Sequence, residues 1–259
     1  MRFENRLRAR MAAGEVALVA TVALGRTGDT ARLLAVAGFD VMVIDREHNL
    51  IPEEACAEML MAALETGITP LVRLPDAAPG PIGQALSAGA LGVVIPRVED
   101  AVTAEAVVRA ATFPPGGRRP VPPVFPHFRR VPVGQAEATA RLAAETAVVV
   151  IIETAAAVAA ADAIAAVPGV DVLFLGASDL MADLGTPGAK ESPALWQAAE
   201  AVVAACRRHG KVPGMGGIPD EAAMARAAGM GVRYISAAHD ATLLQAAATE
   251  RVRKLRGGS

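Results

Sequence analysis

Short apolar runs rich in β-branched residues alternate along the chain with longer segments of helical length. An apolar run without polar alternation is typical of a strand buried on both faces, as in a parallel sheet. The pattern therefore predicts eight strands, covering Ala17–Val22, Val41–Ile44, Thr69–Val72, Gly92–Ile95, Val148–Ile152, Val172–Leu175, Lys211–Gly214 and Val232–Ser236.

The intervening segments predict helices, among them Pro52–Thr66, Ile82–Ala88, Val102–Ala111, Ala155–Val167, Ala194–His209, Asp220–Ala228 and a last helix Ala241–Leu255. Alternation of strands and helices favours parallel βαβ units, which also fit a doubly wound open sheet. Eight units favour a closed TIM (β/α)8 barrel. We expect residues 1–259 to form this barrel as a single domain, since a barrel needs roughly 250 residues.

A Pro/Gly/Arg-rich loop at residues 113–134 interrupts the alternation. Proline at this density cannot continue a helix or a central strand. Long loops in compact domains are usually functional or mobile, so we expect a lid or an oligomer contact here.

Composition excludes several classes of partner. Hydrophobic residues make up 53% of the chain, and the net charge of −2 gives no reason to expect nucleic acid or an anionic membrane. The two cysteines, Cys56 and Cys206, lack metal or redox spacing and are expected to be buried. Glu4 and Glu15 interrupt the one stretch that resembles a secretion signal. We expect a cytoplasmic protein.

Polar residues follow most of the predicted strands at their carboxyl ends. In a parallel barrel these ends converge on the rim where chemistry takes place. The residues concerned are Asp45, Glu47 and His48 after the second strand, Arg73, Arg97, Glu153, Ser178 and Asp179 after the next four, and His239 and Asp240 after the last.

Glu153 and Asp179 are the candidate metal ligands, because each follows an apolar strand and the two strands are consecutive. Two carboxylates that leave other positions open suit Mg²⁺ or Mn²⁺. The alternative is structural: either carboxylate could cap the helix that follows it.

Arg73 and His48 are the candidate catalytic side chains. A fixed guanidinium stabilises an enolate or carboxylate oxygen, although an ion pair with Asp76 or Glu47 is the alternative for Arg73. His48 is the natural proton carrier, since imidazole titrates near neutrality. Asp45 and Glu47 would orient or tune it, or else serve the turn.

The turn Gly176–Asp179 offers backbone N–H groups at a helix start, with Gly176, Ala177 and Ser178 as candidate substrate-binding residues for a carboxylate. The glycine-rich segment Gly214–Gly217 has similar potential, including for phosphate.

With these residues in place, nearly the whole chain resembles the HpcH/HpaI-type class II, metal-dependent pyruvate aldolases. The resemblance is carried by Ala37–Asp40, Ile44–His48, Pro70–Arg73, Ala88–Ala90, Val94–Pro96, Phe113–Gly117 with Arg119, Ile152–Thr154, Pro168–Asp171 and Leu175–Leu180.

The resemblance implies a divalent metal (Mg²⁺ or Mn²⁺, with Co²⁺ also acceptable) on Glu153 and Asp179, chelated by pyruvate. It further implies that Arg73 steadies a metal-bound pyruvate enolate and that His48 assists proton transfer. The expected reaction cleaves a 4-hydroxy-2-oxo acid into pyruvate and an aldehyde, or forms the acid from these two compounds. Such enzymes look like hexamers (trimers of dimers) in which the last helix packs on a neighbouring subunit.

The chain departs from the family pattern at Arg46, Ser87, Pro120 and Ile151. These departures leave two alternatives open. One is a synthase or decarboxylase that uses an oxaloacetate-derived enolate, as in a citrate-forming synthase or macrophomate synthase. The other is a barrel that binds a 2-oxo acid without turnover. Arg46 near the rim would favour an anionic second substrate, with a solvent-facing salt bridge as its alternative. No role is assigned to His127 or His239.

Overall fold

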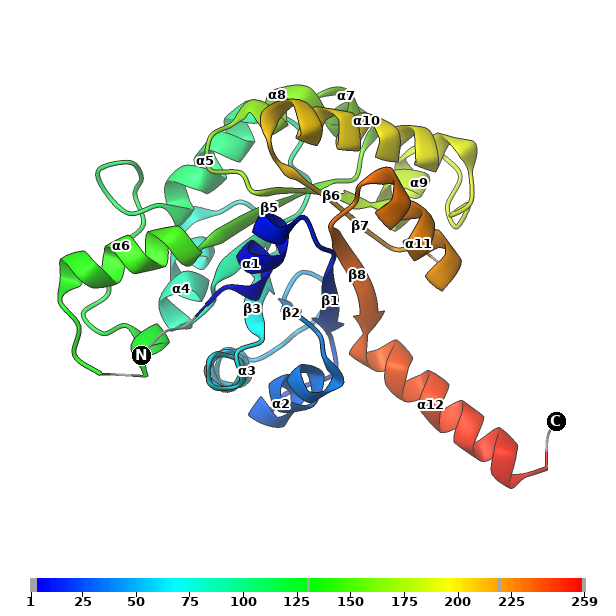
Figure 1. Cartoon of the computed structure of the whole chain (residues 1–259), viewed down its shortest axis with the longest axis horizontal. Coiled ribbons are helices and arrows are strands. Elements are labelled where there is room, and N and C mark those ends of the chain that lie inside the picture. Colours follow the sequence, from blue (N-terminus) through cyan, green and yellow to red (C-terminus); the bar gives the residue numbers. More distant parts are fainter. Residues whose placement is uncertain (1–3, 130, 219, 258–259) are drawn as a thin grey trace.

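The computed structural model describes residues 4–129, 131–218 and 220–257. Eight parallel strands pair in sequence order and close into a barrel, with helices on the outside (Figure 1). This confirms the predicted single-domain TIM barrel. The strands are β1 Ala17–Val22, β2 Val41–Asp45, β3 Thr69–Arg73, β4 Gly92–Ile95, β5 Ala147–Ile152, β6 Val172–Gly176, β7 Val212–Gly216 and β8 Tyr234–His239.

The predicted bounds of β1 and β4 agree with the structure, whereas β7 and β8 extend further toward the rim than expected. Two glycines of the glycine-rich segment Gly214–Gly217, Gly214 and Gly216, are strand residues of β7, and Gly216 pairs with Gly176 of β6. Glycine resembles turn chemistry in a sequence, yet it also fits where neighbouring side chains approach a strand closely. At Gly216 an added Cβ would lie 2.4 Å from the Phe174 ring.

The main helices around the barrel are α1 Arg6–Ala13, α2 Gly28–Ala37, α3 Glu53–Thr66, α4 Pro79–Ala88, α5 Ala101–Ala111, α6 Gln135–Glu145, α7 Ala155–Ala159, α8 Ala161–Ala166, α9 Ala177–Asp183, α10 Pro193–His209, α11 Glu221–Met230 and α12 Asp240–Leu255. The prediction of a single helix over Ala155–Val167 is wrong in one respect, because the structure has two helices there, α7 and α8. Ala160, at φ −87° and ψ 0°, departs from helical geometry and separates them.

The barrel wall separates two apolar cores. Residues that point inward, such as Val19, Val43, Leu71 and Tyr234, form a small inner core. Residues that point outward, such as Met42 and Ile44, form the larger core between the strands and the helices. Both cysteines are free and buried, as expected.

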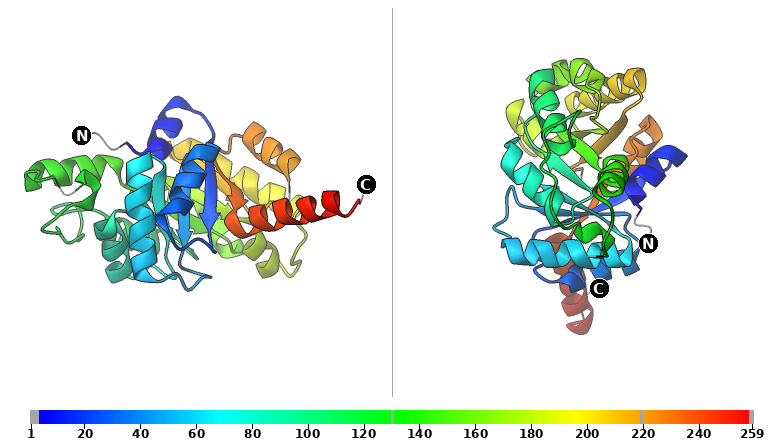
Figure 2. Two further views of the ribbon diagram at one scale, coloured as in Figure 1. Left: turned by 90° about the horizontal axis from the view of Figure 1, so that it is seen from below. Right: turned by 90° about the vertical axis from the view of Figure 1, so that its left-hand side faces the viewer.

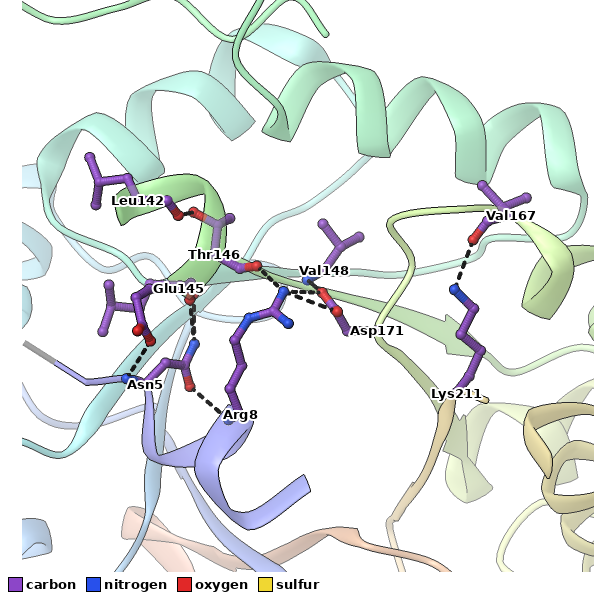
Figure 3. A network of polar contacts seen from close by, with 10 residues as sticks. Asn5, Arg8, Leu142, Glu145, Thr146, Val148, Val167, Asp171 and Lys211 are labelled. Atoms are coloured by element: carbon purple, nitrogen blue, oxygen red, sulfur yellow. Dashed lines mark hydrogen bonds and ion pairs between the residues drawn. The ribbon is translucent and has the colours of Figure 1, made fainter. Parts of the chain in front are cut away.

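Helix α1 closes the amino end of the barrel, where Leu7 is fully buried in the inner core. The Asn5 side chain donates to the carbonyl of Glu145 at 2.6 Å (Figure 3). Arg8 donates to the Thr146 carbonyl and to the Asp171 carboxylate, which also accepts from the Val148 backbone. Burial raises the pKa of Asp171 despite the charge of Arg8. This network ties α1 to β5 and to the loop before β6.

The described part of the 113–134 segment packs on the barrel wall. Phe113, Phe125 and Phe128 form a third core with α6. Arg119 is buried under the Phe113 ring and donates to the Leu86 carbonyl, and the His127 ring bonds the Ala90 carbonyl. These anchors lie near the amino ends of β4 and β5, away from the rim. This placement does not support the expected lid, and the oligomer contact stays a prediction.

Helix α12 projects away from the barrel in both Figure 1 and Figure 2. None of its residues, all of which the structure describes, is buried. Leu243, Leu244, Val252 and Leu255 are exposed along it. Among the described residues, no helix is long and apolar enough to cross a membrane.

Candidate active site

A cavity of about 380 Å³ opens at the carboxyl ends of the strands. Its floor is apolar and its mouth is polar. The lining residues are Val19, Thr21, Val43, His48, Arg73, Val94, Ile151, Glu153, Phe174, Gly176, Ala177, Ser178, Asp179, Gly216, Gly217, Tyr234, Ser236 and His239. Seven of the nine residues predicted as site residues are in this set, and Asp45 and Glu47 are not.

Arg73 is fixed in the cavity wall by two carboxylates. Its Nε and Nη2 atoms lie 2.8 Å from the two Asp45 oxygens, and its Nη1 lies 3.3 Å from Glu47. Burial would lower the pKa of Arg73, but the hydrogen bond and charge of Asp45 outweigh burial and raise it. Likewise burial acts to raise the pKa of Asp45, and Arg73 more than compensates, so the net shift is downward. Both groups therefore stay charged.

Asp45 also orders the turn that carries His48. It is 1% exposed and accepts from the Glu47 backbone at 3.1 Å and from the Asn49 side chain at 2.5 Å. The His48 ring lies at the mouth with its Nε2 3.6 Å from Glu47. Asp45 and Glu47 thus contact Arg73 and His48 without lining the cavity themselves.

Glu153 is buried at the end of β5, with 5% of its surface exposed. Its Oε1 accepts the backbone N–H of Arg97 at 2.8 Å. Arg97 has φ +52°, an uncommon conformation for a residue with a side chain, and this conformation accompanies the contact with Glu153. Gly176 packs on the other side, where an added Cβ would lie 3.0 Å from Glu153 Oε2.

Glu153 and Asp179 are close enough for their charges to interact. Burial raises the pKa of Glu153, the Arg97 N–H opposes this, and the charges of Asp179 and Glu47 raise it further. A divalent cation between such carboxylates would relieve the repulsion, and Mg²⁺ and Mn²⁺ prefer oxygen ligands. No cluster of three metal-ligating side chains occurs in the described residues. The donor set nonetheless fits an ion that retains water or substrate oxygens as its other ligands.

Gly176, Ala177 and Ser178 line the cavity where β6 passes into α9. The N–H groups in the first turn of a helix have no partner within that helix. Gly217, with φ +75°, packs against Ser178 so closely that a Cβ would lie 2.9 Å from its hydroxyl. The close packing fixes this turn beside β7.

Sequence reasoning missed several lining residues and assigned no role to His239. Thr21, Phe174, Tyr234 and Ser236 point inward from β1, β6 and β8. Alternation along each strand is the signal that would have found them, because it separates inward from outward residues once a barrel is assumed. Arg46 pairs with Glu53 at 3.5 Å, which matches the salt-bridge interpretation.

The fold and this rim define a barrel enzyme, and comparisons with known proteins identify which kind. The HpcH/HpaI aldolase/citrate lyase family model matches residues 23–240, and the chain belongs to this family. The chain is 37% identical over 255 residues to 4-hydroxy-4-methyl-2-oxoglutarate aldolase tasA of Hapsidospora irregularis, covering 96% of this chain and 93% of the relative.

Two further similarities agree. Hydroxypyruvate/pyruvate aldolase of Roseovarius nubinhibens is 34% identical, with 86% of each chain covered. The crystal structure of HpcH/HpaI aldolase from Desulfitobacterium hafniense DCB-2 superimposes with a TM-score of 0.91, at 31% identity and 96% coverage of both chains. The predicted family and the carbon–carbon lyase class are thereby confirmed.

Proposed function

We propose that this protein is a divalent-metal-dependent aldolase that cleaves or forms 4-hydroxy-2-oxo acids, with pyruvate and an aldehyde or ketone as the other reactants. The observation that carries the proposal is one cavity holding a fixed cation, Arg73, and two mutually repelling carboxylates, Glu153 and Asp179. The aldolase names of the relatives agree with this chemistry.

In the proposed reaction, each of these residues would have a separate role. Glu153 and Asp179 hold the metal, which acts as a Lewis acid that draws charge from the 2-oxo acid when bound. Arg73 donates to the oxygen that becomes negative as the carbon–carbon bond breaks. Because Asp45 and Glu47 already hold Arg73 in place, it needs no reorganisation during the reaction.

His48 has the exposure and the neighbour that a proton carrier needs. Its side chain is 53% exposed at the mouth, and Glu47 lies close enough to orient the ring. We assign it the proton transfer at the 4-hydroxyl group. The N–H groups of Gly176, Ala177 and Ser178 are proposed to bind the carboxylate of pyruvate, because all three line the cavity beside Asp179.

The proposed substrate class follows from chemistry shared by the relatives. 4-Hydroxy-4-methyl-2-oxoglutarate, named for one relative, is itself a 4-hydroxy-2-oxo acid whose retro-aldol cleavage gives two pyruvates. We further propose a cytoplasmic homo-hexamer, a trimer of dimers, in which α12 packs on a neighbour. The exposed apolar side chains of α12 and its lack of buried residues support that packing.

The test is pyruvate release from 4-hydroxy-2-oxo acids with added Mg²⁺ or Mn²⁺. We expect turnover that EDTA abolishes and that Glu153→Ala removes, with Glu200→Ala on the exposed face of α10 as the matched control. Undiminished turnover in Glu153→Ala would overturn the metal assignment. Oxaloacetate decarboxylation without aldol cleavage would favour the synthase alternative. Thermal stabilisation by pyruvate and metal without turnover would favour the non-catalytic alternative.

A further inference from the structure

Strand β8 changes the direction of its side chains just before it reaches the rim. Tyr234 belongs to the inner core and Ser236 lines the cavity, as alternation requires. Ala237 and Ala238 then both pack against the outer core, so alternation fails at this point. The next residue, His239, lines the cavity again. Without this break, His239 would point away from the cavity.

The pairing with β1 shows the cause. Val19 pairs with Ser236, but the next residue, Ala20, pairs with Ala238, and Thr21 then pairs with His239. Ala237 is therefore an extra residue, a β-bulge. Bulges occur next to active sites, where the added residue re-aims a side chain. Here the bulge brings His239 level with Thr21, and both side chains face the cavity.

Asp240 fastens the end of the bulged strand. Its carboxylate accepts the backbone N–H groups of Ala23, Leu24 and Gly25 at 2.8–3.0 Å. It also accepts the N–H of Ala241 at 2.8 Å. The Asp240 carboxylate thus joins the loop after β1 to the start of α12, and His239 is the preceding residue in the chain. These backbone hydrogen bonds of Asp240 hold the main chain of His239 in place.

The three polar groups on this side of the cavity have no hydrogen-bond partner in the described protein. The Thr21 and Ser236 hydroxyls make no such bond, and the nearest ion-pair atom to the His239 ring is an Asp240 oxygen 3.8 Å away. That oxygen already accepts backbone N–H groups. The three groups can therefore donate to a ligand that presents hydrogen-bond acceptors.

The location fits the second reactant. In a closed eight-stranded barrel, β1 and β8 lie across from β5 and β4, and Glu153 ends β5. The side that carries Glu153, Asp179 and Ser178 is the side proposed above for pyruvate and the metal. The carbonyl acceptor, which the pyruvate enolate attacks in the addition and which is released in the cleavage, must occupy the remaining part of the same cavity.

We propose that His239, with Thr21 and Ser236, binds a carboxylate carried by the acceptor, which makes the preferred acceptor an oxo acid and not a simple aldehyde. The inference rests on the proposed function and names the substrate class of the same site. A carboxylate is the group that accepts from several donors at once, and hydrogen bonds to charged groups are the stronger ones.

The experiment compares two acceptors in the addition of pyruvate, with Mg²⁺ present. Glyoxylate carries a carboxylate beside its carbonyl, and acetaldehyde does not. We expect His239→Leu to lower kcat/KM for glyoxylate about tenfold or more, through KM, while acetaldehyde changes by less than about twofold. His239→Gln keeps an N–H donor and should recover much of the loss. His209→Gln, on α10, is the control.

A separate measurement keeps this inference distinct from the proposed function. Exchange of the pyruvate methyl protons with D₂O, followed by NMR, requires enolate formation and no acceptor. Suppose that the wild-type protein catalyses this exchange. If His239→Leu then lowers kcat/KM equally for both acceptors, or for neither, the proposed role of His239 alone is overturned. No exchange with any divalent metal would overturn the proposed function and this inference together.

Discussion

Asp45 and Arg73 are register partners on neighbouring strands, and they meet through two contacts of 2.8 Å. Parallel pairing brings the last residues of β2 and β3 side by side, so the sheet itself aligns the carboxylate with the guanidinium. The two-point geometry fixes the plane of the Arg73 fork as well as its charge. The position of the proposed enolate-stabilising cation is thus a product of strand register.

Asp45→Asn should therefore impair both stability and activity. The substitution leaves Arg73 without its main counter-charge, and breaking a buried ion pair costs roughly 3 kcal/mol. We expect a loss of that order in urea denaturation and a fall of about tenfold or more in kcat/KM. Asp162→Asn is the control, because its partner Arg208 is exposed and the change should be hardly measurable. Wild-type activity in Asp45→Asn would show that Arg73 needs no such support.

Gly176→Ala should reduce activity while leaving the fold intact. The new Cβ would stand 3.0 Å from Glu153 Oε2 and 3.2 Å from Ile151, so the carboxylate must shift. The shift required is a few tenths of an ångström. A misplacement of about 1 Å can cost on the order of a hundredfold in rate, so we expect a smaller but measurable loss. Gly229→Ala in α11 is the matched control, because a Cβ there meets no atom within 4 Å. It should raise stability by about 0.5–1 kcal/mol without affecting turnover. Equal activities of the two variants would contradict the proposed role of Gly176.

Glu153→Gln should stabilise the metal-free protein at neutral pH. Burial, together with Asp179 and Glu47, raises the pKa of Glu153 above its ordinary value. The folded state then binds a proton more tightly than the unfolded state, so stability falls as pH rises through the interval between the two pKa values. Removing the charge should add about 1 kcal/mol to the free energy of unfolding at pH 7. Urea titrations after EDTA treatment, with Glu200→Gln as control, test this; a destabilised Glu153→Gln would contradict it.

His127 should make the protein sensitive to acid. The pKa of His127 is lowered from 6.5 to about 4, chiefly by burial and also by the charge of Arg119, against the hydrogen bond to Ala90. Between these two values the unfolded chain binds a proton that the folded chain does not. The stabilisation is therefore complete above pH 6.5 and is lost as pH falls toward 4. We expect His127→Gln to flatten this dependence in denaturation curves recorded across that range, and His209→Gln to leave it unchanged. An unaltered slope in His127→Gln would assign the effect to other groups.

Strand positions could be predicted from the sequence because β-branched runs such as Val41–Ile44 are buried on both faces in the barrel. The ends of those runs also predicted which polar residues meet, since parallel strands share one carboxyl edge. Arg73, Glu153 and Asp179 line a single cavity for this reason.

Features that depend on pairing between distant strands could not be predicted in the same way. The bulge at Ala237 exists only relative to β1, more than 200 residues earlier, and nothing in the local sequence of small residues marks it. The support of Glu153 by the backbone N–H of Arg97 is equally invisible, because backbone groups carry no residue identity. The sequence of the 113–134 segment predicted an irregular loop, but it did not predict where on the barrel the loop lies. That position depends on the packing of its buried aromatic residues.

Because α1 closes the amino end of the barrel, contacts that stabilise the fold lie apart from the residues of the candidate active site. Asn5, Arg8 and Asp171 lie at the end of the barrel opposite His48 and Glu153. Substitutions that tighten the α1 network can therefore be selected for heat resistance without altering catalysis. The same separation leaves the mouth unobstructed when the protein is attached to a support through the face that α1 occupies.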